Sequence, residues 1–317
     1  MNIYYDLSEI KREQNTFLTL GTFDGIHLGH QKIIDELIRK AKSANVRNFL
    51  ITFDPHPRNV ISRNGDFRIL STPSEKAVVL EKLGIQNLLI INFTKEFSQH
   101  TAEEFFKEFI IESIGIREIV IGYDHHFGKG RGGDEKTLRD MGRQYGFEVE
   151  AVDAFRLNND IISSTKIRKA LSDGDIKTSN AYLGRNYEFS GEVIHGDKRG
   201  RELGFPTANI DLDYKAKLLP ALGIYLVEFI TDNLRYYGLL SIGKRPTFYN
   251  SGTIVPEVYI YDFDKDIYGK NVRVRIINRL RGEEKFSSAK ELVTQMEIDK
   301  TNGIEIIRNL DPVNKNL

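Results

Sequence analysis

The first half of the sequence alternates short apolar segments with amphipathic helical patterns, and this alternation strongly constrains the fold. Four segments are short, rich in β-branched and aromatic residues and bounded by polar or turn residues, as buried strands are: TFLTLGTFD, VRNFLITFD, NLLIINF and EIVIGYD. Between them, HQKIIDELIRKAK has its apolar side chains on one helical face, and TAEEFFKEFIIESI begins with a Thr cap and a Glu three residues later. The alternation predicts an α/β domain with a parallel sheet, which binds ligands at the carboxyl ends of its strands.

The pattern changes near residue 185. Strand-like segments separated by Gly, Asn, Asp or Pro follow one another, among them GIYLVEFIT, LRYYGLLSIG and KNVRVRIINRLR. They predict a small, mainly antiparallel barrel or sandwich, closed by a helix over SAKELVTQMEIDK. A chain of 317 residues is long enough for two domains, so we place a boundary near Gly184, between a domain at 1–184 and a domain at 185–317.

Composition excludes several classes of protein. Lys plus Arg (45) equal Asp plus Glu (45), so no overall charge draws the chain to nucleic acid or to a membrane. The absence of cysteine excludes disulfides, thiolate metal sites and cysteine catalysis. The first residues lack the pattern of a signal peptide, and no apolar run approaches the roughly 20 residues that span a bilayer. We expect a cytoplasmic protein that binds neither nucleic acid nor membranes.

The stretch GTFDGIHLGH, residues 21–30, lies between the first predicted strand and the first predicted helix. A helix N-terminus presents unpaired N–H groups and the positive end of the helix dipole, so phosphate is the expected ligand. His27 and His30 add donors that can follow charge onto a phosphoryl group. The spacing of the glycines excludes a dinucleotide fingerprint and a Walker A loop. A plain turn with incidental histidines stays open as an alternative, whereas for zinc two histidines alone make an incomplete ligand set.

Three further stretches bring phosphate-seeking groups to the same predicted sheet edge. TFDPHP puts His56 at the end of the second strand, GYDHHFGKGRGGDE predicts a mobile cationic loop, and SSTKIRKAL begins a helix that supplies Lys166 and Arg168. Such a set fits nucleotidyl transfer, which aligns an acceptor phosphate with the α-phosphate of a nucleotide, uses Mg²⁺ and cationic donors and needs no protein nucleophile. GTFDGIHLGH also resembles the HxGH signature of the nucleotidylyltransferase superfamily, which implies a Rossmann-like fold.

A second candidate site lies in the other half, in HGDKRGRELGFPTANI and VPEVYIYDF. Thr207 and Asn209 are two residues apart, so on a strand they point to the same side and offer two neutral oxygens to a hard cation. Glu257 shares a strand face with Val255 and Tyr259. If that face is buried, the pKa of the carboxylate is raised, which suits a general base for an alcohol. If the face is outward, Glu257 is a surface charge and the first stretch is a polar turn leading into a strand.

Taken together, these motifs resemble those of the bacterial bifunctional riboflavin kinase / FMN adenylyltransferase family, the FAD synthetases, over essentially the whole chain. The first half contains GTFDGIHLGH, TFDPHP, FGKGRGG and SSTKIR, and the second contains GRELGFPTANI, GIY, IGKRPTF, EVYIYDF, DIYG and RLRGEEKF. The resemblance implies a first domain that transfers AMP from ATP to FMN, giving FAD and pyrophosphate. It implies a second domain, a six-stranded barrel, that phosphorylates riboflavin with ATP.

The resemblance also implies roles for individual residues. In the first domain it implies ATP binding by Gly21, Phe23, Asp24, His27, Gly29, His30, Asp124, Gly128, Ser164, Thr165, Lys166 and Arg168, with His27, His30 and Arg168 catalytic. It implies flavin binding by Phe53, Pro55, His56 and Arg58. In the second domain it implies nucleotide binding by Gly196, Lys198, Gly200, Arg201, Gly204 and Thr207, Mg²⁺ binding by Thr207 and Asn209, and flavin binding by Arg281, Glu283 and Phe286. Glu257 would deprotonate the ribityl 5′-hydroxyl.

Five positions depart from the family pattern. Family members commonly have Phe-Arg where this chain has His125 and His126, and Arg where it has Lys166, which lacks the bidentate phosphate contact of arginine. Asparagine is usual at Ser241 and histidine is common at Tyr259. Two alternatives to a bifunctional enzyme therefore stay open. One is a riboflavin kinase with a weakened or redox-selective adenylyltransferase, and the other is a flavin-binding sensor without turnover.

Overall fold

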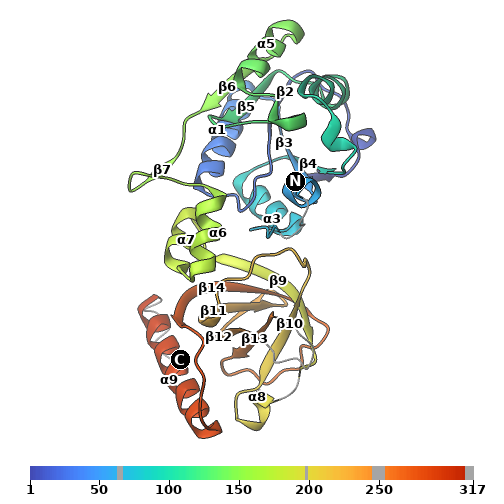
Figure 1. The fold of residues 1–317 in the computed structure, drawn as a ribbon. Coiled ribbons are helices and arrows are strands. Elements are labelled where there is room, and N and C mark those ends of the chain that lie inside the picture. Colours follow the sequence, from blue (N-terminus) through green and yellow to red (C-terminus); the bar gives the residue numbers. More distant parts are fainter. Residues whose placement is uncertain (63–66, 197–198, 245–253, 311–317) are drawn as a thin grey trace. The chain divides into compact units, whose positions relative to one another are not determined.

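The computed structural model describes residues 1–62, 67–196, 199–244 and 254–310 (Figure 1). The chain divides into two compact units, Met1–Ser164 and Thr165–Leu317, and each is described by itself. The helices α6 (Ser164–Asp173) and α7 (Ile176–Leu183) fall almost wholly in the second unit. There the backbone N–H of Ala221 donates to the carbonyl of Leu171 at 2.9 Å. The domain boundary near Gly184 stays a prediction.

A six-stranded parallel sheet forms the centre of the first unit, as the alternating pattern predicts. Its order is β1-β4-β3-β2-β5-β6. The strands are β1 (Asn2–Tyr4), β2 (Thr16–Leu20), β3 (Arg47–Asp54), β4 (Asn87–Asn92), β5 (Glu118–Gly122) and β6 (Glu148–Val152). The chain passes from β2 outward to β3 and β4 and then returns to β5 on the other side of β2. Ligands of such sheets bind at this reversal, outside the carboxyl ends of the strands.

Helices cover both faces of this sheet, because its inner strands are apolar on both sides. Leu50 packs in the cluster that contains residues of α1 (Leu28–Ala44) and α3 (Pro73–Leu83). Its neighbour Phe49 packs in the opposite cluster, with residues of α4 (Ala102–Phe105), η3 (Phe106–Ile114) and α5 (Glu135–Tyr145). The shorter elements are η1 (Leu7–Glu9), α2 (Pro57–Ile61), η2 (Phe97–Gln99), η4 (Lys129–Arg131), β7 (Arg156–Leu157) and β8 (Asp160–Ile161).

The segment TAEEFFKEFIIESI differs from the single α-helix that its sequence predicts. The predicted cap is confirmed, since the Thr101 side chain and Glu104 form a reciprocal capping box. After Phe105, however, the chain continues as the π-helix η3. Phe106, Ile110 and Ile114 of η3 are buried in the core beside the sheet.

The second unit is a closed antiparallel barrel of order β10-β13-β12-β11-β14-β9, which confirms the barrel prediction. Its elements are β9 (Tyr187–Ile194), α8 (Arg199–Glu202), β10 (Thr207–Leu212), β11 (Gly223–Thr231), β12 (Leu234–Lys244), β13 (Ile254–Ile260), β14 (Asn271–Arg281) and α9 (Ala289–Leu310). Alternate residues of β11 point to opposite sides. Tyr225, Val227 and Phe229 are fully buried in the barrel, while Leu226 packs outward.

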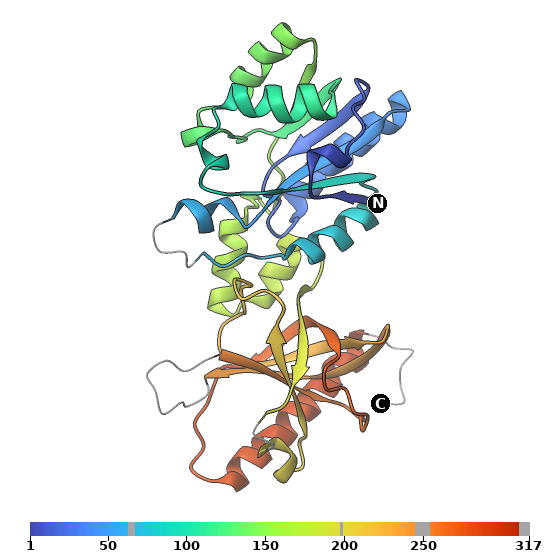
Figure 2. The same ribbon diagram turned by 90° about the vertical axis from the view of Figure 1, so that its right-hand side faces the viewer.

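The C-terminal helix α9 lies against the outer surface of the barrel (Figure 2). Ile307 of α9 packs with Leu226, Leu239 and Tyr261 of the barrel wall. The helix extends beyond the predicted stretch SAKELVTQMEIDK to Leu310, because Ile304 and Ile307 continue its apolar face. Within the part of the chain that the structure describes, no helix is long and apolar enough to cross a membrane.

Candidate active sites

The first candidate site is the loop between β2 and α1. His27 is the N-cap of α1, and its Nδ1 accepts the backbone N–H of His30 at 3.3 Å. The two imidazoles stack with ring centroids 3.7 Å apart, and His30 meets the edge of Phe23 at 5.2 Å. Because Nδ1 of His27 is an acceptor, the neutral ring has its proton on Nε2, where it is a donor. The structure thus brings both histidines to a helix N-terminus at the carboxyl end of β2.

Asp24, a predicted ATP-binding residue, is buried within this loop with an exposed fraction of 1%. Its Oδ1 accepts the backbone N–H groups of Leu70 and Ser71 at 2.9 and 3.1 Å, and its carbonyl accepts the hydroxyl of Ser164 at 2.9 Å. The carboxylate therefore anchors the loop to the segment before α3. Gly29 lies in the first turn of α1, where an added Cβ would lie 3.1 Å from the His27 ring.

The predicted flavin residues at the end of β3 separate into two groups around Pro55. His56 caps α2 by accepting the backbone N–H of Arg58 at 3.1 Å, and it packs against Phe67 with ring centroids 4.5 Å apart. The Arg58 guanidinium lies 5.1 Å from the centroid of the same Phe67 ring. Phe53 instead contacts Phe93, at a centroid distance of 5.5 Å, within a larger aromatic cluster. Phe67 was not among the predicted residues, because only the folded chain brings it to His56.

The loop after β5 lies next to the loop after β2, since these two strands are neighbours in the sheet. Asp124 is exposed there, beyond the end of the strand. The glycine-rich stretch that was expected to be mobile is tied down at its base. Phe127 and Gly133 pair as a β-bridge, and the backbone N–H of Lys129 donates to the carbonyl of His100 at 2.9 Å. Gly128 has φ 71° and leaves no room for a side chain, because a Cβ would lie 2.6 Å from the Ala102 nitrogen.

SSTKIRKAL forms α6, which begins at Ser164 as predicted. Ser164 is the last residue of the first unit, and Thr165, Lys166 and Arg168 belong to the second. The approach of these three side chains to His30 stays a prediction.

The second candidate site lies on the outer face of the barrel, where three strands bring polar side chains into one row. Asn209 of β10 pairs with Glu257 of β13, and Glu257 pairs on its other side with Ser241 of β12. Thr207 Oγ1 donates to Glu257 Oε2 at 3.2 Å. Glu257 is half-buried, so it is neither a solvated surface charge nor surrounded only by apolar groups. Sequence reasoning placed Thr207, Asn209 and Glu257 correctly on strand faces, but Ser241 joins them only through the strand register.

The glycines before β10 allow close backbone approach to this row. A Cβ on Gly196 would lie 2.2 Å from Asn209 Nδ2, and a Cβ on Gly200 would lie 2.4 Å from the carbonyl of Phe205. Gly204 has φ 84°, which favours glycine. Of the other predicted nucleotide-binding residues, Lys198 lies outside the described residues, as does the side chain of Arg201.

The oxygen donors of the row suit a hard cation such as Mg²⁺. Asn209 is buried, with an exposed fraction of 4%, and the Thr207 hydroxyl uses its hydrogen toward Glu257, which leaves its lone pairs as donors to a cation. A cluster of three or more His, Cys, Asp or Glu side chains that could hold a metal ion is absent from the described residues.

Arg281, the first of the predicted flavin residues in the second unit, is the last residue of β14 and is held by α9. Arg281 Nε donates to both carboxylate oxygens of Asp299 at 3.0 Å, and Arg281 Nη2 donates to Oδ2 at 2.8 Å. The Arg281 guanidinium also lies 5.6 Å from the centroid of the Phe286 ring. Glu283 reaches back toward the barrel, because its Oε1 would lie 3.3 Å from a Cβ placed on Gly243 of β12. Asp299 is thus a residue of this region that sequence reasoning missed.

Comparison with known proteins agrees with two separate candidate sites, one in each half of the chain. Residues 9–166 match the family model described as FAD synthetase, and residues 183–307 match the model described as riboflavin kinase. The bifunctional riboflavin kinase/FMN adenylyltransferase of Bacillus subtilis (strain 168) is 37% identical over 306 residues, which cover 95% of this chain and 96% of that protein. The protein of the same description from Listeria monocytogenes is also 37% identical, with 90% of each chain covered. The chain belongs to the bifunctional riboflavin kinase/FMN adenylyltransferase family.

A solved structure described as a macrolide-efflux protein from Streptococcus pneumoniae has the same fold as this family member. It superposes with a TM-score of 0.85 at 32% identity, and the match covers 94% of this chain and 97% of that one. The match therefore supports the order and pairing of elements in both units.

His125, a departure from the family pattern, lies beside Phe127 with ring centroids 5.6 Å apart. Burial lowers the pKa of His125 from the ordinary 6.5 to about 4, and the positive charges of His126 and Arg131 act in the same direction. The imidazole is therefore neutral in the folded protein at neutral pH, and its Nε2 is buried without a hydrogen-bond partner among the described residues.

The stability of this family member should depend on pH through His125. Its pKa is lower in the folded chain than in the unfolded chain, so below pH 6.5 the unfolded chain takes up a proton first. The contribution of neutral His125 to the free energy of unfolding is complete above pH 6.5 and declines as the pH falls toward 4. We expect His125→Phe to flatten this decline for the first unit, and the exposed control His126→Phe to leave most of it. Urea unfolding at a series of pH values measures both, and equal declines in all three proteins would contradict the assignment.

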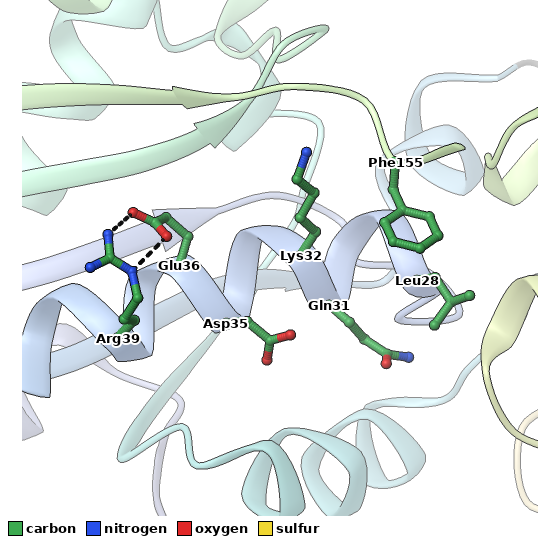
Figure 3. Close-up of a pocket in the computed structure, with 7 residues that line it drawn as sticks. All are labelled: Leu28, Gln31, Lys32, Asp35, Glu36, Arg39 and Phe155. Carbon is green, nitrogen blue, oxygen red and sulfur yellow. Dashed lines mark hydrogen bonds and ion pairs between the residues drawn. The ribbon is translucent and has the colours of Figure 1, made fainter. Parts of the chain in front are cut away.

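The structure also contains a cavity of about 320 Å³ along the outer side of α1 (Figure 3). It is lined by Leu28, Gln31, Lys32, Asp35, Glu36, Arg39 and Phe155, none of which is a predicted site residue. Lys32 donates to the carbonyl of Asp153 at 2.9 Å, and Arg39 pairs with Glu36. Its charged side chains are thus paired within the protein or exposed to solvent.

Proposed function

We propose that the second unit phosphorylates riboflavin with ATP, giving FMN and ADP, and that the first unit transfers AMP from a second ATP to FMN, giving FAD and pyrophosphate. The observation that carries the proposal is that both halves of this family member keep their reacting groups together. Glu257 lies within hydrogen-bond distance of Thr207 and opposite Asn209, and His27 and His30 stack at the start of α1. The ligands of the protein are then riboflavin, FMN, FAD, ATP and ADP.

In the kinase reaction, Glu257 accepts the proton of the ribityl 5′-hydroxyl as that oxygen attacks the γ-phosphorus of ATP. The bond from the γ-phosphorus to the β,γ-bridging oxygen breaks, and ADP leaves. Thr207 orients the carboxylate by donating to Oε2. Thr207 and Asn209 would hold Mg²⁺, which when bound neutralises charge on the phosphate oxygens. Arg281, Glu283 and Phe286 would border the flavin.

In the adenylyl transfer, a phosphate oxygen of FMN attacks the α-phosphorus of ATP, and pyrophosphate leaves. No proton has to be removed from the attacking oxygen, so the protein supplies alignment and donors. The Nε2–H of His27, the ring of His30 and the N-terminus of α1 would stabilise charge on the transferred phosphoryl group. Ser164, Thr165, Lys166 and Arg168 would extend this set, and Phe53, His56 and Arg58 would contact the flavin.

A time course with purified protein, riboflavin, excess ATP and Mg²⁺, resolved by chromatography, tests the proposal. We expect FMN to rise first and then to give way to FAD. FMN that accumulates without FAD would favour a kinase with a weakened or redox-selective adenylyltransferase, and the same assay with reduced FMN would separate those two. Tight flavin binding without consumption of ATP would favour a sensor. The cytoplasmic location stays a prediction.

His30→Ala should separate the two activities. The ring is stacked on His27 at the start of α1, and its loss removes a donor from the adenylyl transfer site alone. We expect FMN adenylylation to fall by about 10²- to 10³-fold, the effect of deleting one donor of this kind. Riboflavin phosphorylation by the same protein is the control and should continue at the wild-type rate. Loss of both activities would contradict the assignment of two separate sites.

A further inference from the structure

A buried lysine lies beneath the first candidate site and has no role in the reaction described above. Lys76 of α3 has an exposed fraction of 4%. Its Nζ donates to the carbonyl of Thr22 at 2.8 Å and to Thr52 Oγ1 at 3.3 Å. The Thr52 hydroxyl in turn donates to the same Thr22 carbonyl at 3.1 Å. Burial of an ammonium group costs free energy unless the group is hydrogen-bonded. These three hydrogen bonds connect α3, β3 and the loop after β2, and they stabilise Lys76 in its buried position.

The loop that Lys76 contacts has an unusual backbone. Phe23 and Ile26 have φ values of 43° and 39°, a region that side-chain-bearing residues rarely adopt, and Gly25 between them has φ 86°. Such conformations persist only where the surroundings hold them, and they occur often at functional sites. The loop connects directly to His27, so its conformation decides where the stacked histidines lie.

Two anchors hold this loop, one on each side of Phe23. On one side, Lys76 binds the carbonyl of Thr22. On the other, the carboxylate of Asp24 accepts the backbone N–H groups of Leu70 and Ser71, a few residues before α3. Both anchors therefore connect the loop to α3 and to the segment that leads into it. Removal of the Lys76 ammonium group would leave the Thr22 carbonyl with the weaker anchor of the Thr52 hydroxyl, at 3.1 Å.

The charges around Lys76 favour its ammonium form. Asp24 and Asp54 are the carboxylates that act on it, and both raise its pKa, whereas burial is the larger effect and lowers it. The hydrogen bond to the Thr22 carbonyl needs only a donor, but the two carboxylates give a cationic donor an advantage over a neutral one.

We propose that Lys76 is a positioning residue for adenylyl transfer, which holds the loop between β2 and α1 in the conformation that stacks His27 and His30. This inference rests on the proposed function of the first unit. Lys76 acts through the Thr22 carbonyl and does not touch the reacting atoms.

Three variants test this role. Lys76→Met has a similar volume and no donor, Lys76→Gln keeps a donor but no charge, and Lys82→Met removes an exposed lysine from the same helix as a matched control. We expect Lys76→Met to lower the rate of FAD formation by about 100-fold, the cost of a small misplacement of catalytic groups. Lys76→Gln should recover about tenfold of that loss because the donor is retained. Lys82→Met and riboflavin phosphorylation by all variants should be unchanged.

Hydrogen–deuterium exchange of the same proteins provides a second readout that a general loss of stability would not produce. We expect faster exchange in Lys76→Met confined to residues 22–30, with β3 and α3 still protected. The proposal would be overturned if exchange in this loop were unchanged or were faster throughout the first unit. It would also be overturned if Lys76→Met and Lys76→Gln formed FAD at equal rates. If the wild-type protein forms no FAD, the proposed function fails, and the exchange experiment alone still decides whether Lys76 holds the loop.

Discussion

Glu257→Gln is expected to lower the rate of riboflavin phosphorylation by about 10³-fold, within the range for removal of a general base. Glutamine keeps the size of the side chain and can still accept the Thr207 hydroxyl, but its amide cannot take the proton of the attacking alcohol. FMN adenylylation takes place in the other unit and should be unaffected. The measurement is the initial rate of each reaction, with riboflavin or FMN as the flavin substrate.

Glu192→Gln is a suitable control. Glu192 is an exposed carboxylate on β9, the strand that pairs with β10 on the side away from β13. It should leave both rates unchanged. Riboflavin phosphorylation that survives in Glu257→Gln, or an equal loss of both activities, would contradict the role of Glu257 as the base.

Asp299→Ala is expected to lower the free energy of unfolding of the second unit by about 3–5 kcal/mol, the cost of leaving one partner of a buried ion pair uncompensated. Asp299 is 2% exposed, and it receives three hydrogen bonds from Arg281 and one from Gln295. The pair joins α9 to the end of β14, where the predicted flavin residues begin. Urea unfolding followed by circular dichroism measures the change.

The ion pair between Lys270 and Asp232 offers a matched control, because its side chains are 43% and 62% exposed. Asp232→Ala should cost no more than about 1 kcal/mol, as exposed pairs do. A similar cost for the two variants would mean that Arg281 finds another partner or reaches water when Asp299 is lost.

Local sequence patterns predicted the parts of each site that depend on neighbours along the chain. The place of His30 in the first turn of α1 followed from the glycine-rich turn and the periodic helix after it, and the capping box at Thr101 followed from a spacing of three residues. The shared strand face of Thr207 and Asn209 followed from the alternation of side chains along a strand. These features extend over a few residues, so the sequence alone is enough to predict them.

Such local patterns could not predict the contacts between segments that lie far apart in the sequence. No local signal shows that Asp24 accepts hydrogen bonds from Leu70 and Ser71, or that Phe67 packs on His56. Nor does the composition of the loop between Gly128 and Gly133 reveal the bridge that ties its base. Each of these contacts depends on how the elements pack, and any residue of suitable size and polarity could have been the partner.

The sequence by itself determined the parallel α/β domain, the barrel that follows it and the two sets of residues suited to phosphate chemistry, because hydrophobic periodicity and turn residues act locally. Only the tertiary structure decided which groups meet. The barrel register sets Ser241 beside Glu257, α9 brings Asp299 to Arg281, and α3 brings Lys76 to the loop before His27. The physical reason is that buried charges and strained backbone need partners from other elements, and only packing determines where those partners lie.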